Sequence, residues 1–193
     1  MITSKNNSAV GNIKLFGNVR VMTVAGLFIA MSIVLGKFLA INIGTSIRIS
    51  FENLPVLMAG IFFGPFVGGA VGLGADIIGS ILKGYDINPI IALGAASIGI
   101  FSGLSSMLIS RTRAKSTSLV NILVSVFSAH IIGSMIIKSI GMIVYFHTPI
   151  EVIALRIPLY IGIGLLEFFV IFLLLKNKAF VSYIERMNHR RNQ

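Results

Sequence analysis

Long apolar stretches with almost no charges are the feature that most constrains this chain. Hydrophobic residues make up 55% of its 193 residues and charged residues only 11%, and the mean hydropathy is +0.95. Soluble domains carry about 25% charged residues, so a chain with half that fraction cannot cover its surface with polar groups. Intrinsic disorder requires low hydrophobicity and is excluded as well. The composition therefore predicts an integral membrane protein.

The apolar stretches are continuous rather than alternating, which favours membrane helices over a β-barrel. A helix crosses the hydrocarbon core with roughly 20 apolar residues. Six segments fit, the second of them short: Val19–Phe38, Phe51–Phe63, Pro65–Leu82, Pro89–Ile109, Leu119–Phe146 and Ile157–Leu175. The first is too long for the apolar region of a signal peptide, and further spans follow it. We expect an all-α membrane domain of six helices over residues 19–175.

The distribution of Lys and Arg predicts the orientation of these helices. Eleven of the sixteen cations lie before or at Arg20, in the loop around residues 111–115, or after residue 175. Six spans place these three regions on one side, and cytoplasmic loops carry the excess of Lys and Arg. We therefore expect residues 1–18 and 176–193 to be cytoplasmic tails of a plasma-membrane protein. The same cations form no basic face with aromatics, so no nucleic-acid partner is expected.

Five cations and several acids fall on the predicted outer side, on loops or within the outer halves of spans. The cations are Lys37, Arg48, Lys83, Lys138 and Arg156. Charges within spans are costly and usually face a bundle interior, a cavity or a partner. Solvation at the membrane interface is an alternative for Lys37 and Lys83. An internal salt bridge between Asp76 and Lys138 is another.

The outer connections predict a pocket. The segment Leu39–Ser50 partly alternates apolar and polar residues around Gly44-Thr45, which is typical of a short hairpin. A second polar loop covers residues 83–89, and a third begins at His147. Together with nearby aromatic residues, these loops favour a ligand pocket that opens outward. Its cations suggest an anionic group on the ligand.

Other chemistries lack their motifs. The chain has no Cys, and its three His residues are isolated, without metal-ligand spacing. We therefore expect no catalytic set, no metal site and no cofactor, and we interpret His130 as a residue of the helix bundle. Small residues four apart, such as Gly68 with Gly72 and Gly26 with Ala30, let helices approach closely. For the first pair we expect packing within the protein; the second pair fits either packing or contact with a partner protein.

Several motifs resemble the substrate-binding S components of energy-coupling-factor (ECF) vitamin transporters, and most of all their folate family. These are RISFENLP at residues 48–55, AGIFFGPFVG at 59–68, GADIIG at 74–79 and NPIIALG at 88–94. The resemblance covers about half of the chain. It implies a vitamin-binding subunit rather than an enzyme. Such a subunit binds its vitamin on the outer side and docks on a transmembrane coupling protein joined to two cytoplasmic ATPases.

The family carries an Ala-x-x-x-Ala pattern on its first span, which meets the coupling protein. The matching positions here are Gly26 and Ala30, so the resemblance implies that they form the docking surface. Gly in place of the first Ala departs from the pattern but keeps the surface small.

Folate would need two kinds of contact. Its amino-pyrimidinone edge suits a carboxylate acceptor, and its anionic glutamate tail suits Arg or Lys. Aromatic side chains would stack on its rings. The candidate substrate-binding residues are Arg48, Phe51, Glu52, Asp76, Lys83, Tyr85, Lys138, Arg156 and Tyr160.

Three alternatives stay open. The ligand could be another vitamin or small anion, such as pantothenate. The chain could be a small membrane-embedded enzyme, although no catalytic cluster is visible. It could also be a scaffold subunit, which would have no reason to keep Asp76 and Lys138 at lipid depth.

Overall fold

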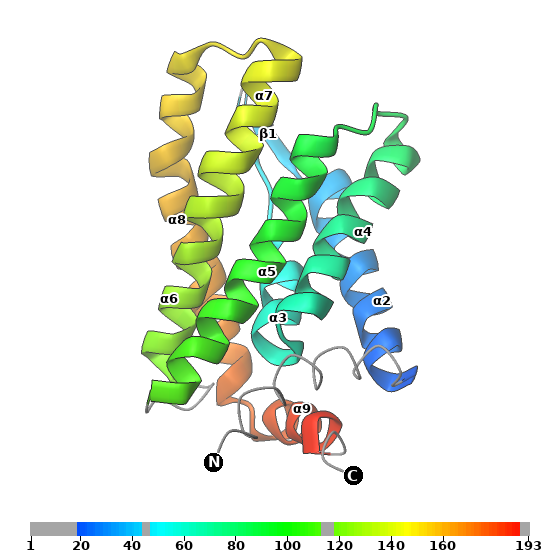
Figure 1. Cartoon of the computed structure of the whole chain (residues 1–193), viewed down its shortest axis with the longest axis vertical. Helices are drawn as coiled ribbons and strands as arrows, with labels where there is room; N and C mark the ends of the chain where they lie inside the picture. The colour runs from blue at the N-terminus through cyan, green and yellow to red at the C-terminus, as the bar shows by residue number, and fades with distance from the viewer. Residues whose placement is uncertain (1–18, 44–46, 113–117, 190–193) are drawn as a thin grey trace, which may run out of the picture.

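The computed structural model describes residues 19–43, 47–112 and 118–189, and it is a bundle of helices that stand side by side (Figure 1). Two segments, η2 and η3, are π-helical continuations of the helices before them. The elements in order are α2 (Val19–Ile33), η2 (Val34–Phe38), β1 (Ile41–Ile43), β2 (Ile47–Ile49), α3 (Asn53–Phe63), α4 (Pro65–Lys83), α5 (Pro89–Thr112), α6 (Leu119–Ala129), η3 (His130–Ile137), α7 (Lys138–Phe146), α8 (Ile150–Lys176) and α9 (Lys178–His189).

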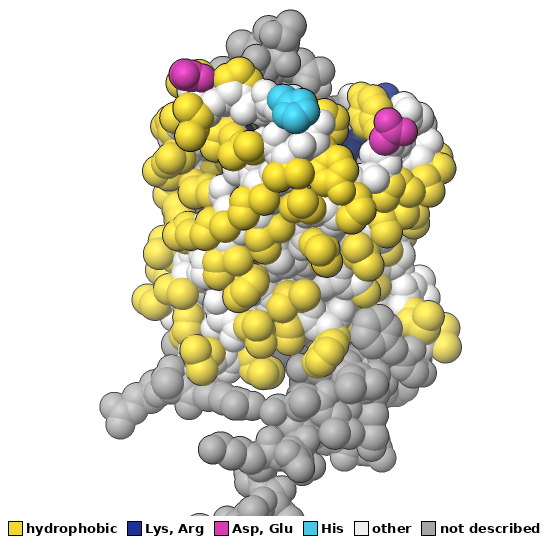
Figure 2. Space-filling model, turned by 45° about the horizontal axis from the view of Figure 1, so that its top comes forward, with side chains coloured by type: hydrophobic (Ala, Val, Ile, Leu, Met, Phe, Trp, Pro, Cys, Tyr) yellow, Lys and Arg dark blue, Asp and Glu magenta, His cyan; other side chains and the backbone are white. Residues whose placement is uncertain are grey.

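Five helical stretches among the described residues are long and apolar enough to cross a membrane. They are Val19–Phe38, Pro65–Lys83, Pro89–Ser110, Leu119–Phe146 and Ile150–Lys176. Figure 2 shows apolar side chains covering the flank of the bundle, with charged side chains at its upper rim. The predicted helical membrane architecture is confirmed in this form. Six crossings, with both termini inside, remain a prediction.

The second predicted span is a short helix at the centre of the bundle. Helix α3 has 11 residues and so is about 16 Å long, roughly half the thickness of the hydrocarbon core. Ten of its residues are buried, because it is apolar on all sides. It ends at Gly64, which has a φ of 93°, a backbone conformation that glycine adopts readily and other residues rarely do. Pro65 then starts α4. This turn sends the chain back along the bundle.

Glycines bring α3, α4 and α5 into close contact. A Cβ built at Gly68 on α4 would lie 2.5 Å from the carbonyl oxygen of Gly99 on α5 and 2.6 Å from the Cα of Gly60 on α3. Gly72 meets the backbone of Ala95 in the same way. The small residues of the third predicted span therefore serve packing within the protein, as the sequence suggested.

The predicted outer hairpin is present as two short strands. β1 and β2 pair antiparallel, with Ile41 opposite Ile49 and Asn42 opposite Arg48. The Gly44-Thr45 pair at its tip lies outside the described residues. The strands follow η2 and precede α3, so the hairpin lies between the end of η2 and the start of α3 in the chain.

One predicted boundary moves, and one predicted tail contains a helix. Helix α8 begins at Ile150, seven residues before the predicted start at Ile157, and so includes Arg156. The segment predicted as a tail after residue 175 contains helix α9, which lies across the end of the bundle opposite the hairpin (Figure 1). The ring of Phe180 packs edge-on against Phe62 of α3 at a centroid distance of 5.6 Å. Helix α9 thus covers the carboxyl-terminal end of α3.

We predict that Gly68→Ala lowers the free energy of unfolding by roughly 1–3 kcal/mol, because the added methyl group has no space against α3 and α5. Thermal unfolding of the purified protein in detergent measures the change. Gly162→Ala is the control, since Gly162 is exposed on α8 and a Cβ added there would meet no atom within 4 Å. Equal melting temperatures for the Gly68 variant and the parent would contradict close packing at this crossing.

Candidate functional site

A cavity of about 580 Å³ lies in the half of the bundle that carries the hairpin. Its walls come from η2, the segment before α3, α4, the loop between α4 and α5, and the facing parts of α7 and α8. Ligand pockets for small molecules typically measure 300–1,000 Å³. The cavity is therefore large enough for a vitamin-sized ligand, and it is lined by both charged and aromatic side chains.

Each of the two lysines in the cavity wall lies in or next to a π-helical segment. Lys37 lies within η2, and Lys138 is the first residue after η3. A π-helical turn changes the direction in which the following side chains point, and such turns are frequent at functional sites. These segments let two long apolar stretches turn one lysine each toward the cavity.

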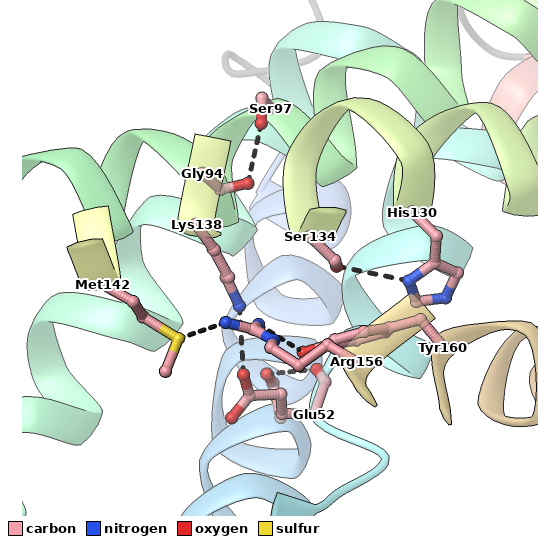
Figure 3. Close-up of polar contacts among 10 residues, drawn as sticks. Glu52, Gly94, Ser97, His130, Ser134, Lys138, Met142, Arg156 and Tyr160 are labelled. Carbon is pink, nitrogen blue, oxygen red and sulfur yellow. Dashed lines mark hydrogen bonds and ion pairs between the residues drawn. The ribbon is translucent and has the colours of Figure 1, made fainter. Parts of the chain in front are cut away.

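An ion pair closes one side of the cavity. The Nζ of Lys138 donates to Oε1 of Glu52 at 3.0 Å, although the two residues lie 86 positions apart (Figure 3). Lys138 is only 6% exposed. The main chain of Glu52 is held as well, because the hydroxyl of Ser32 donates to its carbonyl oxygen at 2.6 Å. A buried ammonium requires such a partner, so the pair fixes the start of α3 against α7.

Arg156 is a cation that has only neutral partners among the described residues. Its Nη2 donates to the hydroxyl of Tyr160 at 3.1 Å, and its Nη1 contacts the sulfur of Met142 (Figure 3). Its guanidinium also lies over the ring of Tyr160, 5.2 Å from the centroid. No described carboxylate forms an ion pair with it. Arg156 is therefore placed to bind an anion that enters the cavity.

Asp76 is an acid of the cavity wall that has no cation bound to it among the described residues. It lies on α4 one turn before Ser80, and both residues line the cavity. Within the described part of the chain its carboxylate has no hydrogen bond or ion pair, whereas Glu52 is already bound to Lys138. A carboxylate with free acceptor positions suits a ligand group that offers several N–H donors.

Six of the nine sequence-predicted binding residues line the cavity. They are Glu52, Asp76, Tyr85, Lys138, Arg156 and Tyr160. Phe51 and Lys83 are not in its wall; Lys83 is exposed and lies over the ring of Phe38, 4.3 Å from the centroid. Arg48 belongs to β2, and its side chain lies outside the described part. The roles of all nine remain proposals.

Lys37 lines the cavity but is not among the nine binding residues predicted from the sequence. Its Nζ lies 5.8 Å from the centroid of the Tyr85 ring at the cavity wall. The sequence groups it with the outer cations, because a lysine at the end of an apolar stretch looks the same whether it faces solvent or a cavity. The alternative salt bridge between Asp76 and Lys138 also differs from the structure, in which Lys138 pairs with Glu52.

The predicted docking residues lie away from the cavity. Gly26 and Ala30 are both on α2 outside the cavity wall, and a Cβ at Gly26 would meet no atom within 4 Å. A small-residue surface is thus available there. The described residues contain no group of three or more His, Cys, Asp or Glu that could hold a metal ion.

Three comparisons with known proteins point to the same family. A family model described as "ECF transporter, substrate-specific component" matches residues 20–182. The folate transporter FolT of Clostridium novyi (strain NT) is 33% identical over 90 residues, which are 43% of this chain and 51% of that protein. The chain thus matches about half of that relative's length.

Two solved structures share the fold. A crystal structure of FolT bound with folic acid has a TM-score of 0.63 at 22% identity, covering 82% of this chain and 95% of that one. The S component of a bacterial ECF transporter has a TM-score of 0.60 at 17% identity, covering 90% of this chain and 98% of that one.

We predict that Lys138→Met lowers the free energy of unfolding by roughly 3–5 kcal/mol, because it breaks a buried ion pair by removing one of the two charges. The double change Lys138→Met with Glu52→Gln should restore most of the loss, since it removes both charges of the pair together. Thermal unfolding in detergent measures both. Lys83→Met, which removes an exposed lysine, should change stability by less than about 0.5 kcal/mol. Equal losses in the single and double variants would show that the ion pair does not hold the two helices.

Proposed function

Because the chain belongs to the family of ECF transporter substrate-specific components, we propose that it captures a folate in the cavity and delivers it to an energy-coupling module. The family is one of transporters, so the protein is a membrane transport subunit rather than an enzyme. The observation that carries the choice of ligand is a pair of charges in one cavity that have no ion-pair partner among the described residues, the carboxylate of Asp76 and the guanidinium of Arg156.

A folate complements these two charges. Its amino-pyrimidinone edge offers adjacent N–H donors, which a carboxylate accepts in two parallel hydrogen bonds, so we assign this edge to Asp76. Its glutamate tail carries carboxylates, which suit the fork of a guanidinium, so we assign the tail to Arg156. Glu52 and Lys138 neutralise each other and shape the wall between these contacts. Tyr85 and Tyr160 supply aromatic faces for the rings.

The relatives support the same ligand. The C. novyi protein that shares 33% identity over 90 residues is named a folate transporter, and one protein of the same fold was crystallised with folic acid. The matched segment is only part of the chain, so the charges in the cavity carry the assignment to folate here. A different vitamin with a carboxylate but no amino-pyrimidinone edge would satisfy Arg156 and leave Asp76 unused.

We further propose how capture is coupled to uptake. Both termini face the cytoplasm of a cell whose plasma membrane holds the protein, so the cavity opens outward. A transmembrane coupling protein then contacts the small-residue surface of α2 around Gly26 and Ala30, and two ATPases drive release inward. The open space around Gly26 supports this role, because small residues let a partner helix approach closely.

We predict that the purified protein binds folic acid with a Kd below about 1 µM, which corresponds to about 8 kcal/mol. Arg156→Ala and Asp76→Asn should each weaken binding more than tenfold, or by about 1.4 kcal/mol. Isothermal titration calorimetry in detergent measures these values. Lys178→Ala and Glu151→Gln are matched controls, because each removes an exposed charge that does not line the cavity.

Two further ligands separate the roles of the two residues. A simple pterin without the glutamate tail should bind less tightly, and Arg156→Ala should leave its affinity unchanged while Asp76→Asn lowers it. Pantothenate should show no binding. Tight binding of pantothenate with none of folic acid would reject the assignment to folate, and full affinity in the Arg156 variant would remove that residue from the site.

We predict that Gly26→Leu and Ala30→Trp block folate uptake in cells that contain the coupling module, while the purified variants keep the parental Kd. The bulky side chains keep a partner helix away from α2 but do not reach the cavity. Uptake of labelled folate gives the readout. Gly162→Leu is the control, because it places the same bulk on the exposed surface of α8. Normal uptake in both α2 variants would locate the docking surface elsewhere.

A further inference from the structure

A second ionisable pair lies inside the bundle, behind the cavity rather than in its wall. Oε2 of Glu167 on α8 and Nε2 of His130, the first residue of η3, share a hydrogen bond of 2.5 Å. The other ring nitrogen of His130 is bonded to the hydroxyl of Ser134 at 3.2 Å. Both His130 and Glu167 are fully buried. Neither residue lines the cavity, so the binding of ligand does not account for them.

The pair is a costly means of joining two helices. A charged or strongly polar group at membrane depth is unfavourable, and Oε1 of Glu167 has no hydrogen-bond partner in the described structure. A neutral contact is enough to join α5 and α6, where Ser105 and Ser128 share a hydrogen bond of 2.7 Å. Apolar residues of similar volume would join η3 to α8 at lower cost. A role in positioning the site would explain why the pair is present.

A short chain of contacts leads from this pair to the cavity. The ring of His130 packs against the ring of Tyr160, with 5.5 Å between centroids and 41° between planes (Figure 3). The hydroxyl of Tyr160 in turn accepts the hydrogen bond from Nη2 of Arg156. Gly164 lies between Tyr160 and Glu167 on the same face of α8, and a Cβ there would approach His130 Cδ2 at 3.4 Å. Gly164 therefore lies directly beside the imidazole.

The local structure of α8 makes such support necessary. Pro158 lies inside the helix, between Arg156 and Tyr160. A proline within a helix removes one backbone hydrogen bond and weakens the connection between the turns on either side. The backbone therefore holds Arg156 less firmly to the inner part of α8. The side-chain hydrogen bond from Arg156 to Tyr160 crosses this weak point, and the ring of His130 holds Tyr160 from the other side.

We propose that His130 and Glu167 are positioning residues for the ligand site: they hold the ring of Tyr160 and, through it, the guanidinium of Arg156. The proposal rests on the proposed function in so far as Arg156 is assigned to the anionic part of the ligand. Glu167 fixes the imidazole, the imidazole fixes the phenol ring, and the phenol hydroxyl orients the guanidinium across Pro158. Affinity at the cavity then depends on a pair that never touches the ligand.

The test replaces both residues by apolar ones of similar volume, His130→Leu with Glu167→Met. This double change removes the positioning contacts without leaving a buried charge unpaired, so the protein should fold with an unchanged or higher melting temperature. Single apolar substitutions are avoided because each leaves the other polar group buried alone. The milder Glu167→Gln keeps a hydrogen-bond acceptor for His130, so this variant should keep nearly parental behaviour.

The first readout needs no ligand. The chain has four tyrosines and can be labelled with 3-fluorotyrosine, and Tyr160→Phe identifies the Tyr160 signal in the ¹⁹F NMR spectrum. The double variant should shift or broaden the Tyr160 signal, whereas Glu167→Gln and the control Ser105→Ala should leave it in place. An unchanged Tyr160 signal in the folded double variant overturns the proposal, whether or not the protein binds folate.

The second readout is the affinity for folic acid. The double variant should bind about tenfold more weakly than the parent, whereas in a Tyr160→Leu background the same double change should have no further effect. Equal losses in both backgrounds would overturn the proposal, because the pair would then act on the whole fold rather than through Tyr160. If the parent itself fails to bind folate, only the proposed ligand is rejected, and the NMR result alone decides the role of the pair.

Discussion

The ion pair between Glu52 and Lys138 is the interaction on which the cavity depends. It joins the start of the short central helix to the helix that follows η3, across 86 positions of sequence. In a bundle with so few charges, each charged group at membrane depth needs a partner, and this pair uses one acid and one cation of the cavity wall. Asp76 and Arg156, which also line the cavity, have no ion-pair partner among the described residues.

The two sides of the cavity are held together by different forces. On the side of α3, α4 and α5, glycines allow backbones to touch, and dispersion contacts over a closely packed crossing hold the helices. On the side of η3 and α8, the contacts near the site are polar and aromatic, and Pro158 weakens the helix between two residues of the cavity wall. The binding of a dipolar ligand between Asp76 and Arg156 would join these two sides.

Hydropathy predicts the helices well because a membrane imposes a length and a composition that are visible in any window of sequence. It fails where a charge belongs to the interior. The predicted start of α8 at Ile157 is wrong because Glu151 and Arg156 resemble loop residues, whereas the cavity accommodates Arg156 within the helix. Helix α9 escapes prediction for a similar reason, because its basic residues suggest a tail while Phe180 and Ile184 pack onto the bundle.

Sequence alone determined that this is a helical membrane protein, where its apolar helices lie, and which scarce charges are candidates for function, because these follow from the cost of placing polar groups in lipid. Only the tertiary structure decided how those charges combine. In the structure, Lys138 forms its ion pair with Glu52 rather than with Asp76, and His130 is bonded to Glu167. Lys37 lines the cavity, whereas Lys83 does not. Pairing depends on distances between residues far apart in the chain and on the direction in which π-helical turns point them, and neither is encoded in local hydropathy.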